Sequence, residues 1–228
     1  IRSLDSGAKI MYVNYTDNKN IIYLQTPEMS LQFDASYFAE NNDSGKYSCK
    51  VSFANKDTDS GVNDLFNMMR KFDEKLINDA YKNSKKWFSG KSLSKEALEQ
   101  LYTPMVKYSI DSETGAISNK YPPGFGFKVV KRNGNSLCKF YNENRELINT
   151  NNHDESGYTQ IEDILKKNTT MTILLQCNGL WFAGGKFGCT WKAIQIKSNK
   201  LETLDNYAFR DSNDNDDVED LVCSDSDE

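Results

Sequence analysis

Two stretches of the sequence combine cations with aromatic rings in a pattern suited to binding a polyanion. Residues 120–145 carry six Lys or Arg and a single acid, Glu143, and residues 186–200 carry four Lys and no acid. Cations along a groove pair with phosphates, and aromatic faces stack on unpaired bases at roughly 1–3 kcal/mol each. The two stretches therefore predict a surface that binds single-stranded nucleic acid. A solvated sheet face is the simpler alternative for the cations.

The candidate nucleic-acid-binding residues come from these stretches and from the segment before them. Side chains alternate across a strand, so in the run 125–130 the rings of Phe125 and Phe127 face away from Lys128. About half of the aromatic residues are therefore expected to belong to the core. The candidate set is Lys107, Tyr108, Lys120, Tyr121, Phe127, Lys128, Lys131, Arg132, Lys139, Tyr141, Trp181, Lys186, Phe187, Trp191 and Lys192.

The last eighteen residues, 211–228, carry nine acids and no base. Removing these nine from the total of 33 acids leaves 24 against 28 bases, so the rest of the chain has a net charge of +4. An acidic segment beside a basic groove can compete with a bound polyanion and can recruit partners. A solubilising terminus is the simpler alternative. The residues assigned to the regulatory and partner-binding role are Asp216, Asp217, Glu219, Asp220, Asp225, Asp227 and Glu228.

Short strands make up most of the elements expected to position these residues. Alternation of apolar and polar residues predicts strands over 8–16, 20–26, 46–54, 105–110, 125–131, 136–142, 171–177, 180–184 and 187–196. A long amphipathic helix is expected over 61–83, because its apolar residues recur at i, i+3, i+4 and i+7. Shorter helices are expected over 94–102 and 159–167.

These elements predict a mostly β (α+β) fold. Short strands with glycine turns, and helices inserted between two blocks of strands, suit a small Greek-key barrel such as an OB-fold. We expect one OB-like nucleic-acid-binding domain over residues 1–210, with a helical insertion over about 60–103. A flexible acidic tail is expected over 211–228.

Residues that would support catalysis or metal binding are scarce. His153 is the single histidine, and no nucleotide-binding, hydrolase or metalloprotease motif occurs. The five cysteines are odd in number and lack zinc-finger spacing. We therefore expect no enzymatic activity, no cofactor, no metal and no disulfide framework. Reduced cysteines favour an intracellular location, and no apolar run is long enough to span a membrane.

The order of features resembles the OB-fold single-stranded DNA-binding proteins of large double-stranded DNA viruses and, more distantly, those of tailed phages. The matching features are the N-terminal AKIMYVNYT…NIIYLQTPEM, the helix followed by KNSKKWF, the segment KYPPGFGFKVV, the closing LWFAGGKFGCTWKAIQIK and the acidic C-terminus. The resemblance implies sequence-nonspecific binding of single-stranded DNA in replication, recombination or repair. It also implies a tail that contacts replication proteins, self-association on DNA, and a host nucleus or cytoplasmic viral replication site.

A second hypothesis comes from a different class of function. The chain would be a non-enzymatic protein–protein adaptor or a structural virion component, with an apolar sheet edge and the acidic tail as contact surfaces. The two hypotheses differ in an observable property, because only the first predicts salt-dependent binding of nucleic acid. The sequence leaves open whether DNA or RNA is preferred.

Overall fold

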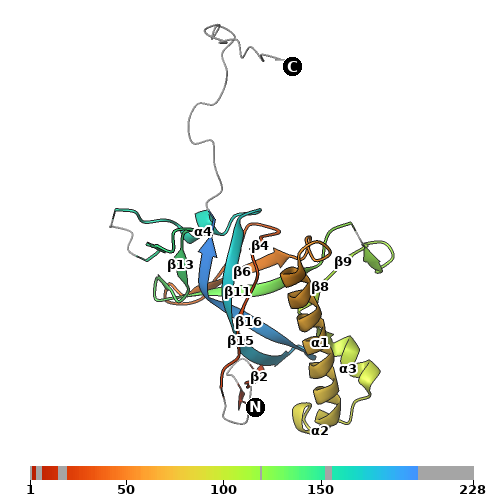
Figure 1. Cartoon of the computed structure of the whole chain (residues 1–228). Coiled ribbons are helices and arrows are strands. Elements are labelled where there is room, and N and C mark those ends of the chain that lie inside the picture. The colour runs from red at the N-terminus through yellow and green to blue at the C-terminus, as the bar shows by residue number, and fades with distance from the viewer. Residues whose placement is uncertain (1, 4–6, 15–19, 119, 152–155, 200–228) are drawn as a thin grey trace, which may run out of the picture.

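Strands dominate the computed structural model, which describes residues 2–3, 7–14, 20–118, 120–151 and 156–199 (Figure 1). The long strands are β6 (Gly45–Ser52), β11 (Gly124–Arg132), β15 (Thr170–Ala183) and β16 (Lys186–Ser198). The prediction of a mostly β fold is confirmed. The acidic tail over 211–228 lies outside the described residues.

The sheet closes into a barrel because one strand, which we call the first strand of the barrel, pairs with β15 on one side and with β6 on the other. That strand is a run of three pieces, β3 (Tyr23–Gln25), β4 (Met29–Ser30) and β5 (Ser36–Ala39). β3 and β4 pair antiparallel with β15, whereas β5 pairs antiparallel with β6. Between them, Leu31 bridges Val51 of β6. Closure leaves the central strands without a free edge.

The order of the strands around the barrel is that of an OB-fold. From the first strand it runs through β6, β11, β16 and β15 and returns to the first strand. β11 and β16 pair in parallel, with Lys128 opposite Lys192, and the other neighbours around the barrel are antiparallel. This is the five-stranded Greek-key arrangement, so the predicted OB-fold-like barrel is confirmed.

Strict alternation assigns the inside and the outside of the barrel. Along β6, Tyr47, Cys49 and Val51 are buried, and the residues between them are partly exposed. Along β11, Phe125, Phe127 and Val129 are likewise buried. The inward half of each strand fills the barrel, and the outward half is left to face solvent.

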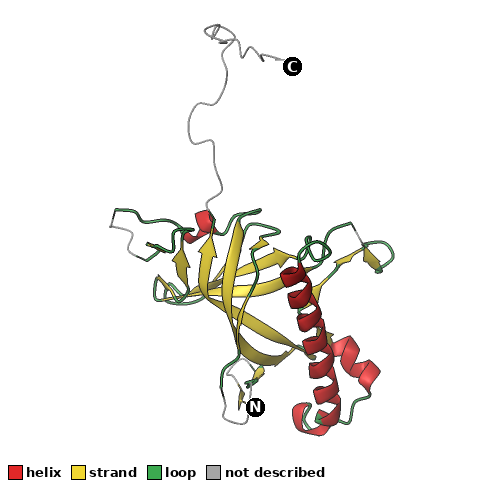
Figure 2. Ribbon diagram, in the orientation of Figure 1, coloured by secondary structure: helices red, strands yellow, loops and turns green. Residues whose placement is uncertain are grey.

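Three helices are inserted between β6 and β11. They are α1 (Ser60–Lys82), α2 (Ser84–Trp87) and α3 (Lys95–Leu101), which lie together on one side of the barrel (Figure 2). The predicted helix over 61–83 is confirmed by α1, and that over 94–102 by α3. α1 packs its apolar stripe toward the core, where the Phe72 ring meets Trp191 edge-on at 6.2 Å.

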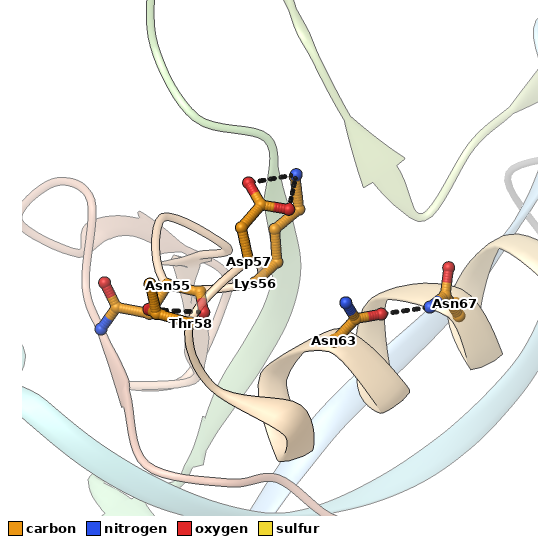
Figure 3. Close-up of polar contacts among 6 residues, drawn as sticks. All are labelled: Asn55, Lys56, Asp57, Thr58, Asn63 and Asn67. Carbon is orange, nitrogen blue, oxygen red and sulfur yellow. Dashed lines mark hydrogen bonds and ion pairs between the residues drawn. The ribbon is translucent and has the colours of Figure 1, made fainter.

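Local hydrogen bonds define where α1 begins. Figure 3 shows the turn before the helix, where Lys56 pairs with Asp57 at 2.7 Å and Thr58 Oγ1 donates to Asn55 O at 3.3 Å. The Asp59 carboxylate then accepts from Val62 N at 3.0 Å. An acceptor at this position satisfies one of the amides that the first helical turn leaves unpaired. Along the exposed side of the first turns, Asn67 donates to Asn63.

A buried carboxylate ties the insertion to the barrel. Asp73 of α1 accepts a hydrogen bond from the Tyr102 hydroxyl at 2.5 Å and from Met105 N at 3.1 Å. Tyr102 begins β7 (Tyr102–Thr103), which pairs with β16, and Met105 precedes β8 (Val106–Lys107), which pairs with β11. Asp73 therefore fixes the segment that carries Lys107. Burial raises the pKa of Asp73 despite these hydrogen bonds.

Short elements complete the fold. The remaining strands are β1 (Arg2–Ser3), β2 (Lys9–Met11), β9 (Ser109–Ile110), β10 (Ile117–Ser118), β12 (Asn135–Ser136), β13 (Lys139–Tyr141) and β14 (Leu147–Ile148). β9 and β10 pair only with each other, in a hairpin that extends away from the barrel (Figure 1). No helix among the described residues is long and apolar enough to cross a membrane.

Several predicted elements differ from the structure. The strand predicted over 105–110 is split into β8 and β9, and that over 136–142 into β12 and β13. The strands predicted over 8–16 and 20–26 are shortened to β2 and β3, each of which pairs antiparallel with β15. The strands over 171–177 and 180–184 are one strand, β15, interrupted by an irregularity between Cys177 and Gly179. The helix over 159–167 is only α4 (Ile161–Ile164), and the Lys167 amide donates to Asp34 Oδ1 at 2.7 Å instead of to a helical carbonyl.

The raised pKa of Asp73 gives a test of this anchor. Its pKa in the folded protein lies above the ordinary value of 3.8, so the native state binds more protons than the unfolded state between the two values. The linkage relation then requires the free energy of unfolding to fall as the pH rises through this window. Measured by urea denaturation, the stability of the wild type relative to Asp73→Asn should decrease from about pH 4 upward.

The control is Asp64→Asn, which removes an exposed carboxylate from the same helix. Its stability relative to the wild type should not follow the same curve. A difference between wild type and Asp73→Asn that stays constant across the pH series would contradict a carboxylate with a raised pKa.

Candidate nucleic-acid interface

Five lysines lie on the outward side of the barrel strands. Lys128 of β11 has Ser48 of β6 and Lys192 of β16 as its Cα partners on either side. Because side chains on one face recur every second residue, Lys46 and Lys50 face the same way as Ser48. We call this surface the lysine face and define it by Lys46, Lys50, Lys107, Lys128 and Lys192. The sequences of β6, β11, β15 and β16 contain no Asp or Glu.

The lysines of this face lie close enough to repel one another. Burial lowers the pKa of Lys50 and of Lys128, and the nearby charge of Lys107 lowers both further. Lys46 also lowers the pKa of Lys128. Like charges that are partly buried favour an incoming anion, because a phosphate would relieve both the repulsion and the desolvation.

The hydrogen bonds of these lysines leave their charge available. Lys128 Nζ donates to Ser48 Oγ at 2.8 Å, which orients the ammonium without neutralising it. Lys46 Nζ pairs with Glu40 Oε1 at 2.6 Å, with both side chains about half exposed. An exposed pair of this kind contributes only about 0–1 kcal/mol, so a phosphate can replace the carboxylate at little cost.

Two exposed phenylalanines flank the lysine face. Phe33, 60% exposed, lies with its ring centroid 6.0 Å from Lys50 Nζ, and Phe38, 54% exposed, lies 5.8 Å from Lys128 Nζ. Both belong to the first-strand run and none of the candidate residues came from it. An exposed ring beside a cation offers a stacking surface for a base whose phosphate the cation binds.

Two glycines of β11 shape the floor of the face. A Cβ atom at Gly124 would meet Lys50 Cε at 2.5 Å and Val51 O at 2.8 Å, so the Lys50 side chain lies over this residue. At Gly126, the Cα partner of Lys50, a Cβ atom would find only Cys49 O at 3.7 Å. Gly126 therefore leaves open backbone between the lysines, whereas Gly124 is required for packing.

A cleft of about 570 Å³ opens at the Lys50 end of the lysine face. One wall is the first-strand run from Glu28 to Phe33, and residues 167–170 lie beside it. Tyr121 and Pro122 contribute the facing residues, and Lys50 is shared with the lysine face. We call this feature the Lys50 cleft.

Three of the candidate aromatic residues were wrong, because they belong to the core. Phe127, Phe187 and Trp191 are at most 2% exposed and cannot stack on a base. The Phe187 ring packs 5.3 Å from Phe88 of the insertion. Trp191 points toward α1, and its Nε1 donates to Met105 Sδ at 3.1 Å. The sequence predicted the insertion, but not that it packs against the rings of Phe187 and Trp191.

The structure brings together only part of the candidate set. Lys107, Lys128 and Lys192 belong to the lysine face, and Tyr121 lines the Lys50 cleft. The other exposed or partly exposed candidates lie outside the lysine face and stay predictions, although Lys120 Nζ lies 5.5 Å from the Tyr121 ring. Tyr108 and Lys120 flank the β9–β10 hairpin, Lys131 and Arg132 pair with β12, Trp181 and Lys186 lie beside the β15–β16 turn, and Lys139 and Tyr141 lie on β13.

Sequence reasoning missed Lys46, Lys50, Phe33 and Phe38. The two lysines could have been found, because they alternate with buried Tyr47, Cys49 and Val51 in one predicted strand. The candidate residues were taken from stretches dense in Lys and Arg, and β6 contains only two lysines. The two phenylalanines lay in a segment, 31–39, for which no element was predicted.

No group of three His, Cys, Asp or Glu side chains among the described residues could hold a metal ion. Cys49, Cys138, Cys177 and Cys189 are buried free thiols. His153 lies outside the described residues.

Residues 49–211 match a protein family described as a family of unknown function, DUF5871. The chain belongs to this family. The match begins within β6 and runs through β16, so it covers the insertion and most of the barrel. No curated protein matches the sequence.

Solved structures similar to this one include phage single-stranded DNA-binding proteins. Gp2.5 of bacteriophage T7 is 12% identical, with a TM-score of 0.46, over 90% of this chain and 100% of that protein. The protein of bacteriophage Enc34, in complex with single-stranded DNA, is 10% identical, with a TM-score of 0.45, over 86% of this chain and 97% of that one. The order of features in the sequence resembled the single-stranded DNA-binding proteins of viruses and tailed phages, and these neighbours belong to that class. Similarity this low does not extend their function to the present chain.

The difference between the two glycines gives a second test. Gly126→Ala should raise the free energy of unfolding by about 0.5–1 kcal/mol, because alanine has less unfolded-state entropy to lose and its methyl group has room. Gly124→Ala should lower it by about 1–3 kcal/mol, because the added Cβ atom overlaps Lys50 and the Val51 carbonyl. Chemical denaturation of the two variants and the wild type measures both changes in the free energy of unfolding. Equal effects would contradict the described geometry of the face.

Proposed function

We propose that this protein binds single-stranded DNA without sequence specificity and has no enzymatic activity. The observation that carries the proposal is the lysine face, a cluster of partly buried cations on strands free of acids. Several lysines on one face suit the repeated phosphates of a nucleic acid better than a single anionic ligand.

The exposed rings favour a single strand over a duplex. Phe33 and Phe38 can stack only on bases whose faces are accessible, and a duplex hides those faces. Stacking on a phenyl ring does not select among the four bases, and the lysines contact only the backbone. Affinity without sequence choice is what a protein that coats single strands in replication, recombination or repair requires.

The acidic residues 211–228 have a proposed role in the same reaction. Their nine carboxylates can occupy the lysine face when DNA is absent and can recruit replication proteins once DNA displaces them. Self-association along the strand belongs to the same proposal. So does a location in the host nucleus or at a cytoplasmic replication site, if the source is viral.

A protein–protein adaptor is the second candidate function. The β9–β10 hairpin favours it, because Ile110 and Ile117 are cross-strand partners and are 59% and 63% exposed. An exposed apolar pair on a projecting hairpin is a feature of contact surfaces. Partners that survive nuclease treatment, without salt-dependent DNA binding, would favour this function.

Removing two lysines tests the proposed function. In fluorescence anisotropy with a labelled oligo-dT of about 30 nucleotides, Lys50→Gln combined with Lys128→Gln should weaken binding. Each lost phosphate contact should also reduce the slope of log K against log salt by about 0.7. A matching duplex should bind more weakly than the single strand at every salt concentration.

The control is Lys75→Gln, which removes an exposed lysine of α1 paired with Asp79 at 2.8 Å. Its affinity and salt slope should equal those of the wild type. Wild-type protein without affinity for oligo-dT at low salt would reject the proposed function.

Truncation after Arg210 tests the role of the tail. The shortened protein should bind oligo-dT more tightly than the full chain, because nine carboxylates no longer compete for the lysines. The gain should be greatest at low salt, where charge interactions are screened least. Equal affinities of the two proteins across the salt series would show that the tail does not compete.

A further inference from the structure

The Lys50 cleft has the composition of a ligand site. Its volume of about 570 Å³ lies within the range of roughly 300–1,000 Å³ that is usual for small-molecule sites. Apolar side chains provide part of the lining, and the amides of Gln32, Asn55 and Asn168 provide hydrogen-bonding groups among them. A cleft that combines apolar surface with hydrogen-bonding groups suits a planar heterocycle.

Hydrogen bonds hold the cleft open in a defined shape. On one side, Gln32 Nε2 donates to the Pro122 carbonyl at 3.0 Å, and Ser109 Oγ donates to the Tyr121 carbonyl at 3.3 Å. On the other side, Asn168 N donates to the Leu31 carbonyl at 2.9 Å. These bonds fix the walls before any ligand arrives, which lowers the entropic cost of binding.

Two aromatic rings in the lining of the cleft are exposed. Phe33 and Tyr121 are both 60% exposed. Each has a cation beside it, because Lys50 Nζ lies 6.0 Å from the Phe33 ring and Lys120 Nζ lies 5.5 Å from the Tyr121 ring. A ring paired with a cation suits a ligand that joins an aromatic group to an anion.

The charges of the lining favour an anion near Lys50. Lys50 and Lys167 line the cleft, and Glu28 is the carboxylate among its lining residues. Glu28 Oε2 accepts from Asn199 Nδ2 at 3.0 Å. Lys50 is partly buried, and the nearby charge of Lys107 makes its own charge less favourable until an anion binds.

We propose that the Lys50 cleft binds one nucleotide, with its base against Phe33 and Tyr121 and its phosphate on Lys50. The proposal rests on the proposed function, because Lys50 belongs to both the cleft and the lysine face, so one strand can occupy both. A free nucleotide has the same chemistry as a nucleotide within a strand. The strand is the ligand we assign, because the lysine face continues directly from the cleft.

An oligomer with a single base tests the cleft. In a fully abasic oligonucleotide the phosphates remain but nothing can stack, and one added thymidine is free to slide to the most favourable site. That thymidine should raise the affinity of the wild type by about 5-fold to 150-fold, the gain that corresponds to one stacked base. Phe33→Ala combined with Tyr121→Ala should reduce the gain to what stacking on Phe38 alone supplies and leave the affinity for the fully abasic oligomer unchanged. Adding Phe38→Ala to this double variant should abolish the remaining gain.

Two control variants separate the cleft from other aromatic residues. Phe38→Ala removes the other ring beside the lysine face, and Tyr81→Ala removes a 54% exposed ring of α1. Tyr81→Ala should keep the full gain from the single thymidine, whereas Phe38→Ala should keep the part of the gain that the cleft supplies. Because the four rings are exposed, all variants should unfold at the wild-type temperature, which thermal denaturation checks.

The outcomes distinguish the cleft from the proposed function. Wild-type protein that does not bind oligo-dT at all would overturn both. Binding of oligo-dT without a gain from the single thymidine, or with a gain that Phe33→Ala combined with Tyr121→Ala leaves undiminished, would overturn the cleft alone. Free dTMP is the alternative ligand of the cleft, and this outcome has its own signature. If free dTMP binds the wild type as tightly as the single-base oligomer does, and does not bind the double variant, the cleft is a site for free nucleotides and the assignment of a DNA strand as its ligand is wrong.

Discussion

The antiparallel pairing of β6 with β11 is the interaction on which the rest of the structure depends. Eight residue pairs, from Gly45 opposite Lys131 to Ser52 opposite Gly124, fix which side chains enter the barrel. A slip of one residue would turn the lysines of either strand inward and its apolar residues outward. The same register therefore builds the core and exposes the lysine face, so neither can change without the other.

The insertion and the first strand complete what this pairing begins. α1 contributes no lysine to the face, but through Asp73 it holds the segment that carries Lys107. The first-strand run contributes the rings of Phe33 and Phe38 because it crosses from β15 to β6. Packing on the inner side holds the like charges in place on the outer side. That arrangement opposes folding slightly and favours an anionic ligand.

Local patterns predicted most elements, whereas long-range pairing decided the site. The sequence predicted the strands over 46–54 and 125–131 and the helix α1, because their periodicity depends only on residues close together in the chain. The parallel pairing of β11 with β16 is not encoded locally. The density of cations along the sequence placed Lys128, Lys139 and Tyr141 in one predicted binding surface. In the structure Lys139 and Tyr141 lie on β13, a different strand from Lys128. Burial of Trp191 required α1, from a segment far earlier in the chain.

The parallel pairing of β11 with β16 also sets when the site can exist during synthesis. Lys128 acquires its neighbour Lys192 only after β15 and β16 have been made, because both follow β11 in the chain. The first-strand run likewise needs β15 as its partner before the barrel can close. A nascent chain that stops after β11 therefore has lysines but no assembled face. The site forms only when the barrel sequence has left the ribosome.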